Sequence, residues 1–213
     1  MRTLLLDLDG TLVDSVPDLA PALNRVFAAR DIPGFTPPEV QAMVGDGAPA
    51  LIAKAFAARD RAPDPQALPE FLADYTAHAA EHTAPYPGVR ETLPALRAAG
   101  WRLAVCTNKP AAPTHELLAA LGLAALFDAV GAGDSFAVRK PDPRHLLATL
   151  DLLGGAAAGA VMVGDHRNDV QAAAGAGLAC IFAAWGYSSR DSAAGASAIA
   201  ESFSELPGLL SQL

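Results

Sequence analysis

The stretch Leu4-Leu5-Leu6-Asp7-Leu8-Asp9-Gly10-Thr11-Leu12 decides the fold. It is a short apolar run that ends in two carboxylates two residues apart, followed by a glycine. We expect a buried strand over residues 3–8, because runs of this kind bounded by Gly and Asp are typical of parallel sheets. Ligands of open α/β sheets bind beyond the carboxyl ends of the strands, so Asp7 and Asp9 lie where a site is expected.

Similar apolar runs recur along the chain, and most are followed by a stretch with helical periodicity. This alternation predicts an α/β fold built on a parallel sheet. The further strands are expected at residues 102–107, 129–131, 160–164 and 179–183, and helices at residues 112–121, 143–153 and 168–176. Asp142 before Pro143 gives the second of these helices an N-cap and a proline in its first turn.

Residues 14–85 interrupt this alternation, because they carry no strand signal. Ser15 and Asp18 form a capping-box pattern that opens a helix over residues 17–30. Further helices are expected at residues 38–43, 48–59 and 66–82. The expected division is therefore an all-helical insertion at residues 14–85 and a core made of residues 1–13 and 86–213.

The composition narrows the classes of function. A net charge of −8, with 15 Lys and Arg spread over 213 residues, does not supply the basic clusters that hold nucleic-acid backbones. No apolar run approaches the ~18 residues that span a bilayer, and the acidic residues from Asp7 onward break any signal-peptide pattern. We therefore expect a cytoplasmic protein with neither a nucleic-acid nor a membrane partner. Cys106 and Cys180 lie in apolar runs, which predicts buried, reduced thiols.

Polar residues at the ends of other predicted strands, or in loops before helices, are expected to converge with Asp7 and Asp9 in one crevice. They are Thr107, Asn108, Lys140, Asp165 and Asp169. Each of them alone would be an ordinary turn or cap residue. The whole set in this order is hard to explain by capping, so we expect a shared site.

Four segments together resemble the motifs of the haloacid dehalogenase-like phosphatase superfamily. They are Asp7-Leu8-Asp9-Gly10-Thr11, Thr107-Asn108-Lys109, Lys140-Pro141 and Gly164-Asp165-His166-Arg167-Asn168-Asp169, within a match from residue 3 to about residue 187. The helical insertion resembles the cap of the phosphoglycolate phosphatase group, and Val44-Gly45-Asp46-Gly47-Ala48 looks like the substrate-facing loop of that cap. The resemblance implies a Rossmann-like parallel-sheet core with an inserted all-helical cap domain.

The resemblance also implies the chemistry of a phosphatase, a phosphoric monoester hydrolase. Asp7 would attack phosphorus and form an aspartyl phosphate. Asp9 would protonate the leaving alkoxide and then activate the water that hydrolyses the intermediate. Thr107 and Asn108 would donate hydrogen bonds to phosphoryl oxygens, and Lys140 would pair with Asp7 and with the developing charge. These residues would therefore share catalysis and substrate binding.

The implied cofactor is Mg²⁺, which prefers oxygen ligands in octahedral geometry. Asp7, the backbone carbonyl of Asp9, and Asp165 would supply the protein ligands. Asp169, one helical turn after Asp165, would bind the ion directly or orient one of its waters. His166 stands where serine is common in the relatives, and we expect it to support the site or cap the following helix rather than to act in catalysis.

The cap loop points to a substrate. Gly45, Asp46 and Gly47 precede a short helix, and backbone NH groups in such a place bind small anions such as carboxylates. Together with the resemblance to the phosphoglycolate phosphatase group, this implies 2-phosphoglycolate as the substrate, hydrolysed to glycolate and phosphate. The side chain of Asp46 is then expected to point away from the bound carboxylate. A sugar phosphate or another small phosphorylated metabolite, and a phosphosugar mutase activity, remain alternatives. The oligomeric state, monomer or homodimer, is also open.

Two other functions match only part of the pattern. A phospho-receiver domain also uses a strand-end Asp, a Thr and a Lys, but it needs neither an inserted cap nor a second Asp two residues later. A dehalogenase on the same fold attacks carbon, and Asp9 together with the acidic pair Asp165 and Asp169 argues against it.

Overall fold

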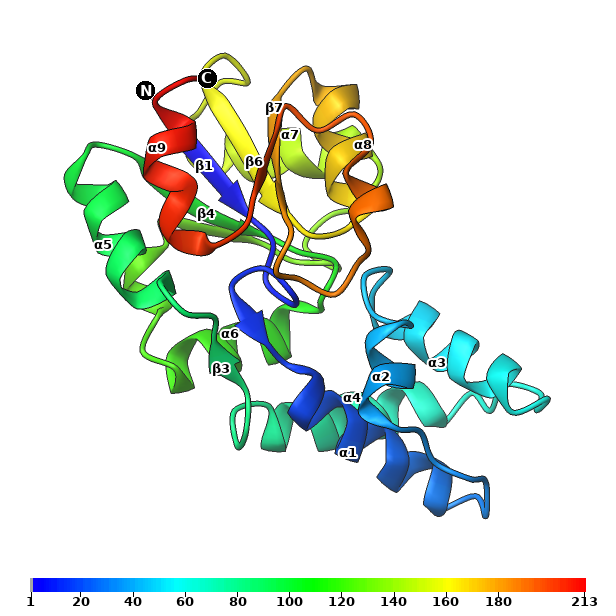
Figure 1. Ribbon diagram of the computed structural model, residues 1–213. Helices are drawn as coiled ribbons and strands as arrows, with labels where there is room; N and C mark the ends of the chain where they lie inside the picture. Colours follow the sequence, from blue (N-terminus) through cyan, green and yellow to red (C-terminus); the bar gives the residue numbers. More distant parts are fainter. Residues whose placement is uncertain (1) are drawn as a thin grey trace.

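The computed structural model describes residues 2–213 and contains a six-stranded parallel sheet (Figure 1). Its strands, in sheet order, are β5 (Ala129–Gly131), β4 (Arg102–Cys106), β1 (Thr3–Leu6), β6 (Ala160–Gly164), β7 (Ala179–Ala183) and β8 (Ala198–Ala200). All neighbouring pairs are parallel, so the carboxyl ends of the strands meet at one edge. Because β1 pairs with β4 and β6, the residue that follows β1 lies near the middle of that edge.

Helices cover both faces of the sheet. Successive side chains of a strand point to opposite faces, so an apolar strand such as β1 presents apolar side chains on both faces, and both are buried by helices. Leu4 and Leu6 of β1 belong to one apolar cluster, and Leu5 belongs to another. The first cluster includes residues of α5 (Val89–Ala98), α6 (Ala111–Ala120) and α9 (Leu206–Leu210), and the second includes residues of α7 (Pro143–Asp151) and α8 (Arg167–Ala176). The sheet is therefore the middle layer of an α/β sandwich.

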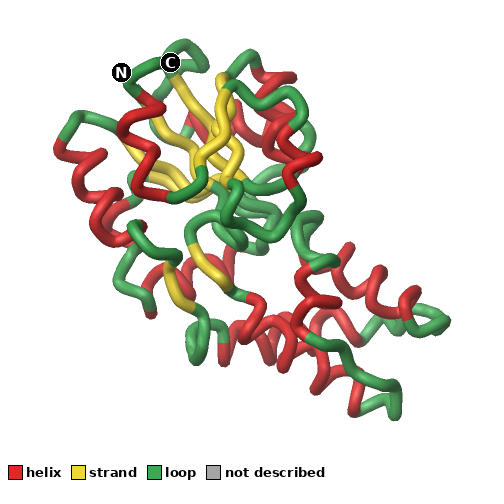
Figure 2. The backbone as a smooth tube through the Cα atoms, viewed as in Figure 1, coloured by secondary structure: helices red, strands yellow, loops and turns green. Residues whose placement is uncertain are grey.

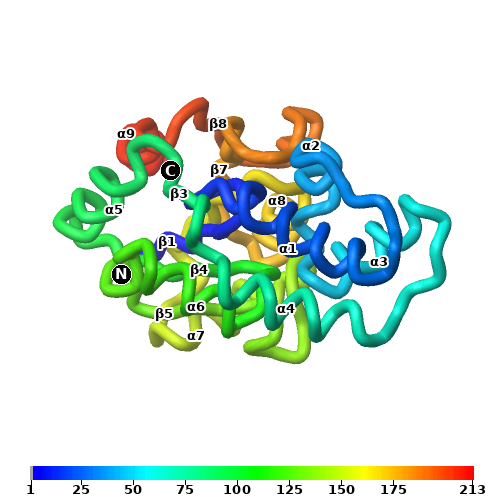
Figure 3. The backbone as a smooth tube through the Cα atoms, turned by 90° about the horizontal axis from the view of Figure 1, so that it is seen from below, coloured from blue at the N-terminus to red at the C-terminus, as the bar shows by residue number. Residues whose placement is uncertain are grey.

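A second group of helices lies beyond the carboxyl ends of the strands (Figures 1 and 2). It consists of α1 (Val16–Ala28), α2 (Pro37–Gln41), α3 (Ala48–Ala58) and α4 (Ala67–His78). These helices share an apolar cluster of their own, in which the Phe27 ring lies 5.1 Å from that of Phe35 and 4.8 Å from that of Phe56. Figure 3 shows α1 and α4 side by side. The short antiparallel strands β2 (Val13–Asp14) and β3 (Ala84–Pro85) join this group to the rest of the chain.

The predicted α/β fold with a parallel sheet is confirmed, with differences at several elements. β1 ends at Leu6 rather than at residue 8, because the NH groups of Leu12 and Val13 donate to Leu8 O and turn the chain. The edge strand β8 and the helix α5 were not predicted. The strand β8 offers a weak sequence signal, because its single large apolar side chain, Ile199, stands between two alanines.

The capping box predicted at Ser15 and Asp18 is wrong. Ser15 is the N-cap residue of α1, but its hydroxyl accepts no hydrogen bond from the helix NH groups and donates to Asp9 Oδ1 at 2.6 Å. The Asp18 carboxylate accepts from His82 N at 3.0 Å and from Thr83 N at 2.7 Å. These contacts also explain why α4 stops short of residue 82.

Two further sequence expectations concern the whole chain. Cys106 and Cys180 are buried and free, as predicted. In the part of the chain that the structure describes, no helix combines the length and the apolar character needed to cross a membrane.

Candidate active site

Asp7 follows β1 at the carboxyl edge of the sheet and is 7% exposed. Its backbone NH donates to Val163 O of β6 at 2.9 Å, and its Oδ1 accepts from Leu8 N at 2.8 Å. The chain then turns at Gly10, where a φ of 82° and the close approach of the Asp165 carboxylate exclude a side chain. The pairing of β1 with β6 thus holds Asp7 next to the end of β6, and the turn packs Gly10 against Asp165.

Three carboxylates gather beside this edge, those of Asp7, Asp165 and Asp169, each offering an oxygen within 4.8 Å of the others. Asp165 follows β6, and its oxygens accept from Thr11 Oγ1 at 3.0 Å and from Tyr187 N at 2.8 Å. Asp169 lies in the first turn of α8 and is fully buried. The elements β1, β6 and α8 thus bring together three residues that the sequence assigned to a metal site.

The electrostatics of this cluster call for a cation. Burial, together with the charges of Asp7 and Asp169, raises the pKa of Asp165 to about 8. Burial also raises the pKa of Asp169 to about 6, although Lys140 opposes the shift. Three carboxylates beside one ammonium leave an excess of negative charge, and carboxylate oxygens are the ligands that hard divalent cations prefer. The residues present therefore fit a divalent metal ion.

Lys140, in the loop before α7, balances part of this charge. It is 3% exposed, and its Nζ lies 2.6 Å from Asp169 Oδ1 and 3.0 Å from Asp7 Oδ1. Burial lowers the pKa of Lys140, but the two carboxylates more than offset this effect and raise it, so the ammonium stays charged. His145 Nδ1 accepts from the backbone NH of Lys140 at 3.2 Å. Burial and the Lys140 charge lower the pKa of His145 to about 4, which keeps the ring a neutral acceptor.

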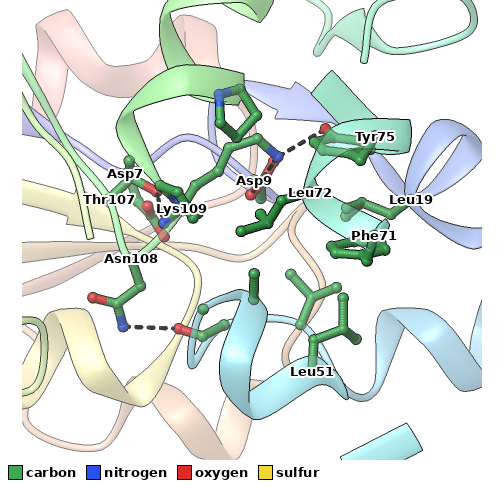
Figure 4. A pocket seen from close by; sticks show the side chains of 16 residues that line it. Asp7, Asp9, Leu19, Leu51, Phe71, Leu72, Tyr75, Thr107, Asn108 and Lys109 are labelled. Carbon is green, nitrogen blue, oxygen red and sulfur yellow. Dashed lines mark hydrogen bonds and ion pairs between the residues drawn. The ribbon is translucent and has the colours of Figure 1, made fainter. Parts of the chain in front are cut away.

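The loop after β4 supplies Thr107 and Asn108, which are both buried. Thr107 Oγ1 accepts from Lys109 N at 3.2 Å, and this leaves the hydroxyl proton for another acceptor. Asn108 Nδ2 donates to Lys140 O at 2.9 Å and to Gly45 O at 3.0 Å. In Figure 4, Thr107 lies beside Asp7, so the structure brings these two predicted site residues together.

The glycine loop before α3 lies against the sheet edge. Gly45 and Gly47 have φ angles of 119° and 87°, and a side chain at either position would collide with the core. The Asp46 carboxylate bonds to Lys54 Nζ at 2.6 Å and accepts from Asn168 Nδ2 at 2.7 Å. Both glycines line the pocket described next, whereas Asp46 is not among its described lining residues. The side chain of Asp46 therefore points away from the pocket, as the sequence predicted.

A pocket lies between the sheet edge and the helices (Figure 4). The carboxylates of Asp7 and Asp9 and the hydroxyl of Thr107 lie on its sheet side. The other lining residues are Leu19, Val44, Gly45, Gly47, Ala48, Leu51, Phe71, Leu72, Tyr75, Asn108, Lys109, Pro110 and Pro113. A bound molecule would thus meet charged groups on one side and a largely apolar wall on the other.

A family model described as haloacid dehalogenase-like hydrolase matches residues 1–177. The chain belongs to the haloacid dehalogenase-like hydrolases. The phosphoglycolate phosphatase of Rhodospirillum rubrum is 44% identical, with 96% of this chain and 89% of that protein covered. The phosphoglycolate phosphatase of Mesorhizobium japonicum is 42% identical, with 86% and 83% covered. The predicted family and the predicted enzyme class, a phosphoric monoester hydrolase, are confirmed.

Solved structures share the fold of this hydrolase over nearly its whole length. A predicted phosphoglycolate phosphatase from Haemophilus somnus matches with a TM-score of 0.90 at 29% identity, and 98% of this chain and 97% of that chain are covered. CbbY from Rhodobacter sphaeroides, in complex with phosphate, matches with a TM-score of 0.80 at 31% identity, and 97% and 96% are covered. The shared fold therefore includes the helical group as well as the sheet.

Sequence reasoning missed three residues that surround Asp9 in this hydrolase. Ser15 Oγ donates to Asp9 Oδ1 at 2.6 Å, and Lys109 Nζ lies 3.1 and 3.2 Å from the two Asp9 oxygens. Tyr75 Oη accepts from Lys109 Nζ at 2.7 Å. Burial lowers the pKa of Lys109, but Asp9 and Tyr75 more than offset this effect and raise it. Lys109 belongs to the motif Thr107-Asn108-Lys109, so the sequence could have indicated a role for it. Tyr75 has no such signal, because its position in the sequence is that of an ordinary buried helix residue.

His166 of the hydrolase caps α8, as predicted. Its Nδ1 accepts from Asn168 N at 3.2 Å. Its backbone NH donates to Asp169 Oδ2 at 3.0 Å, while Asp169 Oδ1 bonds to Lys140. Both oxygens of Asp169 therefore already have protein partners.

Proposed function

We propose that this hydrolase is a magnesium-dependent phosphatase that converts 2-phosphoglycolate into glycolate and phosphate. The observation that carries the proposal is the position of Asp7, which lines the pocket 3.0 Å from the Lys140 ammonium and belongs to a cluster of carboxylates that fits a cation. A phosphate monoester resists attack because it and the nucleophile are both anionic. A site for such an ester must therefore gather positive charge around its nucleophile.

In the proposed reaction, a carboxylate oxygen of Asp7 attacks phosphorus while the bond from phosphorus to the alkoxide oxygen breaks. Asp9 gives its proton to that leaving oxygen. Asp9 then takes a proton from the water that attacks the aspartyl phosphate, which frees Asp7 and releases inorganic phosphate. Thr107 and the backbone NH of Asn108 donate hydrogen bonds to the phosphoryl oxygens, and Lys140 pairs with their charge.

We assign Mg²⁺ to the carboxylate cluster. Asp7, Asp165 and the backbone carbonyl of Asp9 would hold the ion. Asp169 would orient one of its waters, because both oxygens of Asp169 already bond to protein groups. When bound, the ion supplies positive charge that reduces the repulsion between the nucleophile and the phosphoryl group. The raised pKa of Asp165, caused first by burial and then by its acidic neighbours, supports a cation at this place.

Residues 14–85 act in this proposal as a cap over a core made of residues 1–13 and 86–213. The separate apolar cluster of the four helices and the short β2–β3 connection support this division. The glycine loop, with Gly45, Asp46 and Gly47, closes the pocket and offers backbone NH groups at the start of α3 to a carboxylate. Closure of the cap would exclude water until the leaving group departs.

The choice of substrate is supported by the relatives at 44% and 42% identity, which are named phosphoglycolate phosphatases. A sugar phosphate is the second candidate, because a CbbY variant from Rhodobacter sphaeroides, 29% identical with a TM-score of 0.81, was solved with xylulose-1,5-bisphosphate. In either case the partner is a small phosphorylated metabolite. We place the reaction in the cytoplasm, in line with the expectation from the sequence.

The test is phosphate release from a panel of esters, with and without added Mg²⁺. The panel contains 2-phosphoglycolate, several hexose and pentose phosphates and xylulose-1,5-bisphosphate. We expect the highest kcat/KM for 2-phosphoglycolate and no turnover without a divalent ion. A sugar phosphate with the higher kcat/KM would overturn the substrate, and isomerisation of a sugar phosphate without phosphate release would replace the phosphatase by a mutase.

A further inference from the structure

Lys109 differs in charge from everything else in the wall of the pocket. Of the described residues that line the pocket, Lys109 alone carries a positive charge. It is 6% exposed, and its side chain reaches between Asp9 and Tyr75 (Figure 4). The facing helices contribute apolar side chains such as Leu51 and Phe71. A buried ammonium in such surroundings is costly unless it is paired, and here it is paired with Asp9 and Tyr75.

The carboxylate of Asp9 has a second, independent anchor. Ser15 Oγ donates to Asp9 Oδ1 at 2.6 Å, which already fixes one oxygen. A buried ion pair is weak grounds for stability, because well-packed apolar residues often replace such pairs without loss. The position of Lys109 is therefore better explained by a ligand of the pocket than by the need to hold Asp9.

In the proposed reaction the leaving group would lie beside Lys109. Asp9 has to reach the leaving oxygen, and Lys109 Nζ lies 3.1 and 3.2 Å from the two Asp9 oxygens. In 2-phosphoglycolate a single carbon separates that oxygen from the carboxylate. Once Asp9 has given its proton to the leaving oxygen, this carboxylate would face a second anion, and like charges in a pocket of low polarity repel each other strongly. A cation beside Asp9 removes this obstacle.

We propose that Lys109 binds the carboxylate of the leaving group and thereby determines the preference for a small anionic substrate. The inference rests on the proposed function and adds the residue that recognises the acid. Tyr75 Oη accepts from Lys109 Nζ at 2.7 Å, so its own proton remains available to the same carboxylate. Lys109 and Tyr75 then bind the acid from the sheet side and from α4, and the NH groups that open α3 bind it from the loop.

The test compares 2-phosphoglycolate with its carboxamide, 2-phosphoglycolamide, which has nearly the same shape but no carboxylate. The wild-type enzyme should prefer the acid on the order of 10- to 100-fold in kcat/KM, as expected for a charged hydrogen bond. In Lys109→Gln this ratio should fall by most of that factor, even where both rates decrease because Asp9 has lost a neighbour. Lys109→Arg keeps the charge and should retain a preference for the acid.

Arg25→Gln is the matched control, since it also removes one positive charge but lies on α1 in an exposed pair with Asp74. It should leave the ratio unchanged. Competitive inhibition measures binding of the leaving group without turnover of that molecule. Lys109→Gln should weaken inhibition by glycolate but not inhibition by inorganic phosphate. Melting curves confirm that each variant is folded.

The outcomes separate the two proposals. A wild-type enzyme without preference for the acid over the amide, or a folded Lys109→Gln that keeps the preference, would overturn the role of Lys109. A wild-type enzyme that prefers a sugar phosphate would overturn the proposed substrate, while the ratio of acid to amide would still report on Lys109.

Discussion

The sheet edge and the helical wall enclose the same pocket, but their side chains differ in kind. At the sheet edge, Lys140 is buried and lies 2.6 Å from Asp169 and 3.0 Å from Asp7. The wall opposite consists largely of apolar side chains such as Leu51 and Phe71. Strand ends are fixed by the hydrogen bonds of the sheet, which suits groups that must meet a phosphoryl centre accurately. The wall suits selection among leaving groups, so changes on the two sides should have different effects.

The largest effect is expected at the sheet edge. Asp7→Asn should lower kcat by more than about 10⁴-fold for every phosphomonoester, because an amide does not attack phosphorus. Leu51→Ala in the wall is the matched control and should change KM and selectivity while kcat stays within about tenfold. Phosphate release by samples verified by mass spectrometry measures both. Equal losses of kcat in the two variants would break the distinction between edge and wall.

The second-largest effect on the rate is expected at Asp9, which lies between the sheet edge and the helical wall. Asp9→Asn should slow release of the leaving alcohol in the first turnover by ~10²- to 10⁴-fold, because an amide supplies no proton. With p-nitrophenyl phosphate the loss should be much smaller, because p-nitrophenolate leaves without a proton. A loss of the same size with both esters would contradict the role of Asp9 as general acid.

Removal of the metal ion should abolish catalysis by the residues of the sheet edge without altering the helical wall of the pocket. EDTA should stop hydrolysis, Mg²⁺ should restore it, and Ca²⁺ should restore it poorly, because its coordination shell is larger and looser. Mg²⁺ should also raise the Tm of the wild type, since it binds the folded chain, and this rise should shrink in Asp165→Asn. Full activity in EDTA, or an equal rise of Tm in the variant, would argue against the assigned ligands.

The smallest expected effect is on the free energy of unfolding, and it comes from His145, which accepts from the backbone NH of Lys140. The pKa of His145 is lowered to about 4 from an ordinary value of 6.5, chiefly by burial. Between these values the unfolded chain binds a proton that the folded chain does not bind. The contribution of His145 to the free energy of unfolding should therefore fall by about 1.4 kcal/mol for each pH unit as the pH drops from 6.5 to 4. The raised pKa values of Asp165 and Asp169 act in the opposite direction, so the contribution of His145 is read as the difference between the wild type and a variant.

His145→Asn should lose this contribution, because the amide oxygen can still accept from Lys140 N but does not titrate. His115→Asn, at an exposed position of α6, should leave it unchanged. Denaturant unfolding between pH 7 and pH 4 measures the slopes. The same slope in the wild type and in His145→Asn would show that His145 is not its source.

Much of the sheet edge could be predicted, because its residues follow apolar runs in the sequence. Asp7, Thr107 and Asp165 each come directly after a strand, and the topology of a parallel sheet then brings them to one edge. The position of Asp169 followed from its place in the first turn of a helix. Local pattern and fold agree at these positions, so reasoning from the sequence was sufficient.

The wall and the surroundings of Asp9 could not be predicted in the same way. Tyr75 meets Lys109 only because α4 packs over the loop after β4, a contact between segments 34 residues apart. The sequence predicted Ser15 as a capping residue of a helix, yet its hydroxyl donates to the neighbouring carboxylate of Asp9. Side chains whose partners come from tertiary packing carry no periodicity or spacing that would reveal them.

The central claim is that the phosphoryl group passes through Asp7. Rapid mixing of the enzyme with 2-phosphoglycolate and Mg²⁺, acid quenching and mass spectrometry of the peptide that contains Asp7 test it most directly, in the wild type and in the slower Asp9→Asn. The account predicts a phosphoryl group on Asp7 during turnover and none in Asp7→Asn. A phosphoryl group on another residue, or none at any time in either protein while the substrate is consumed, would contradict it.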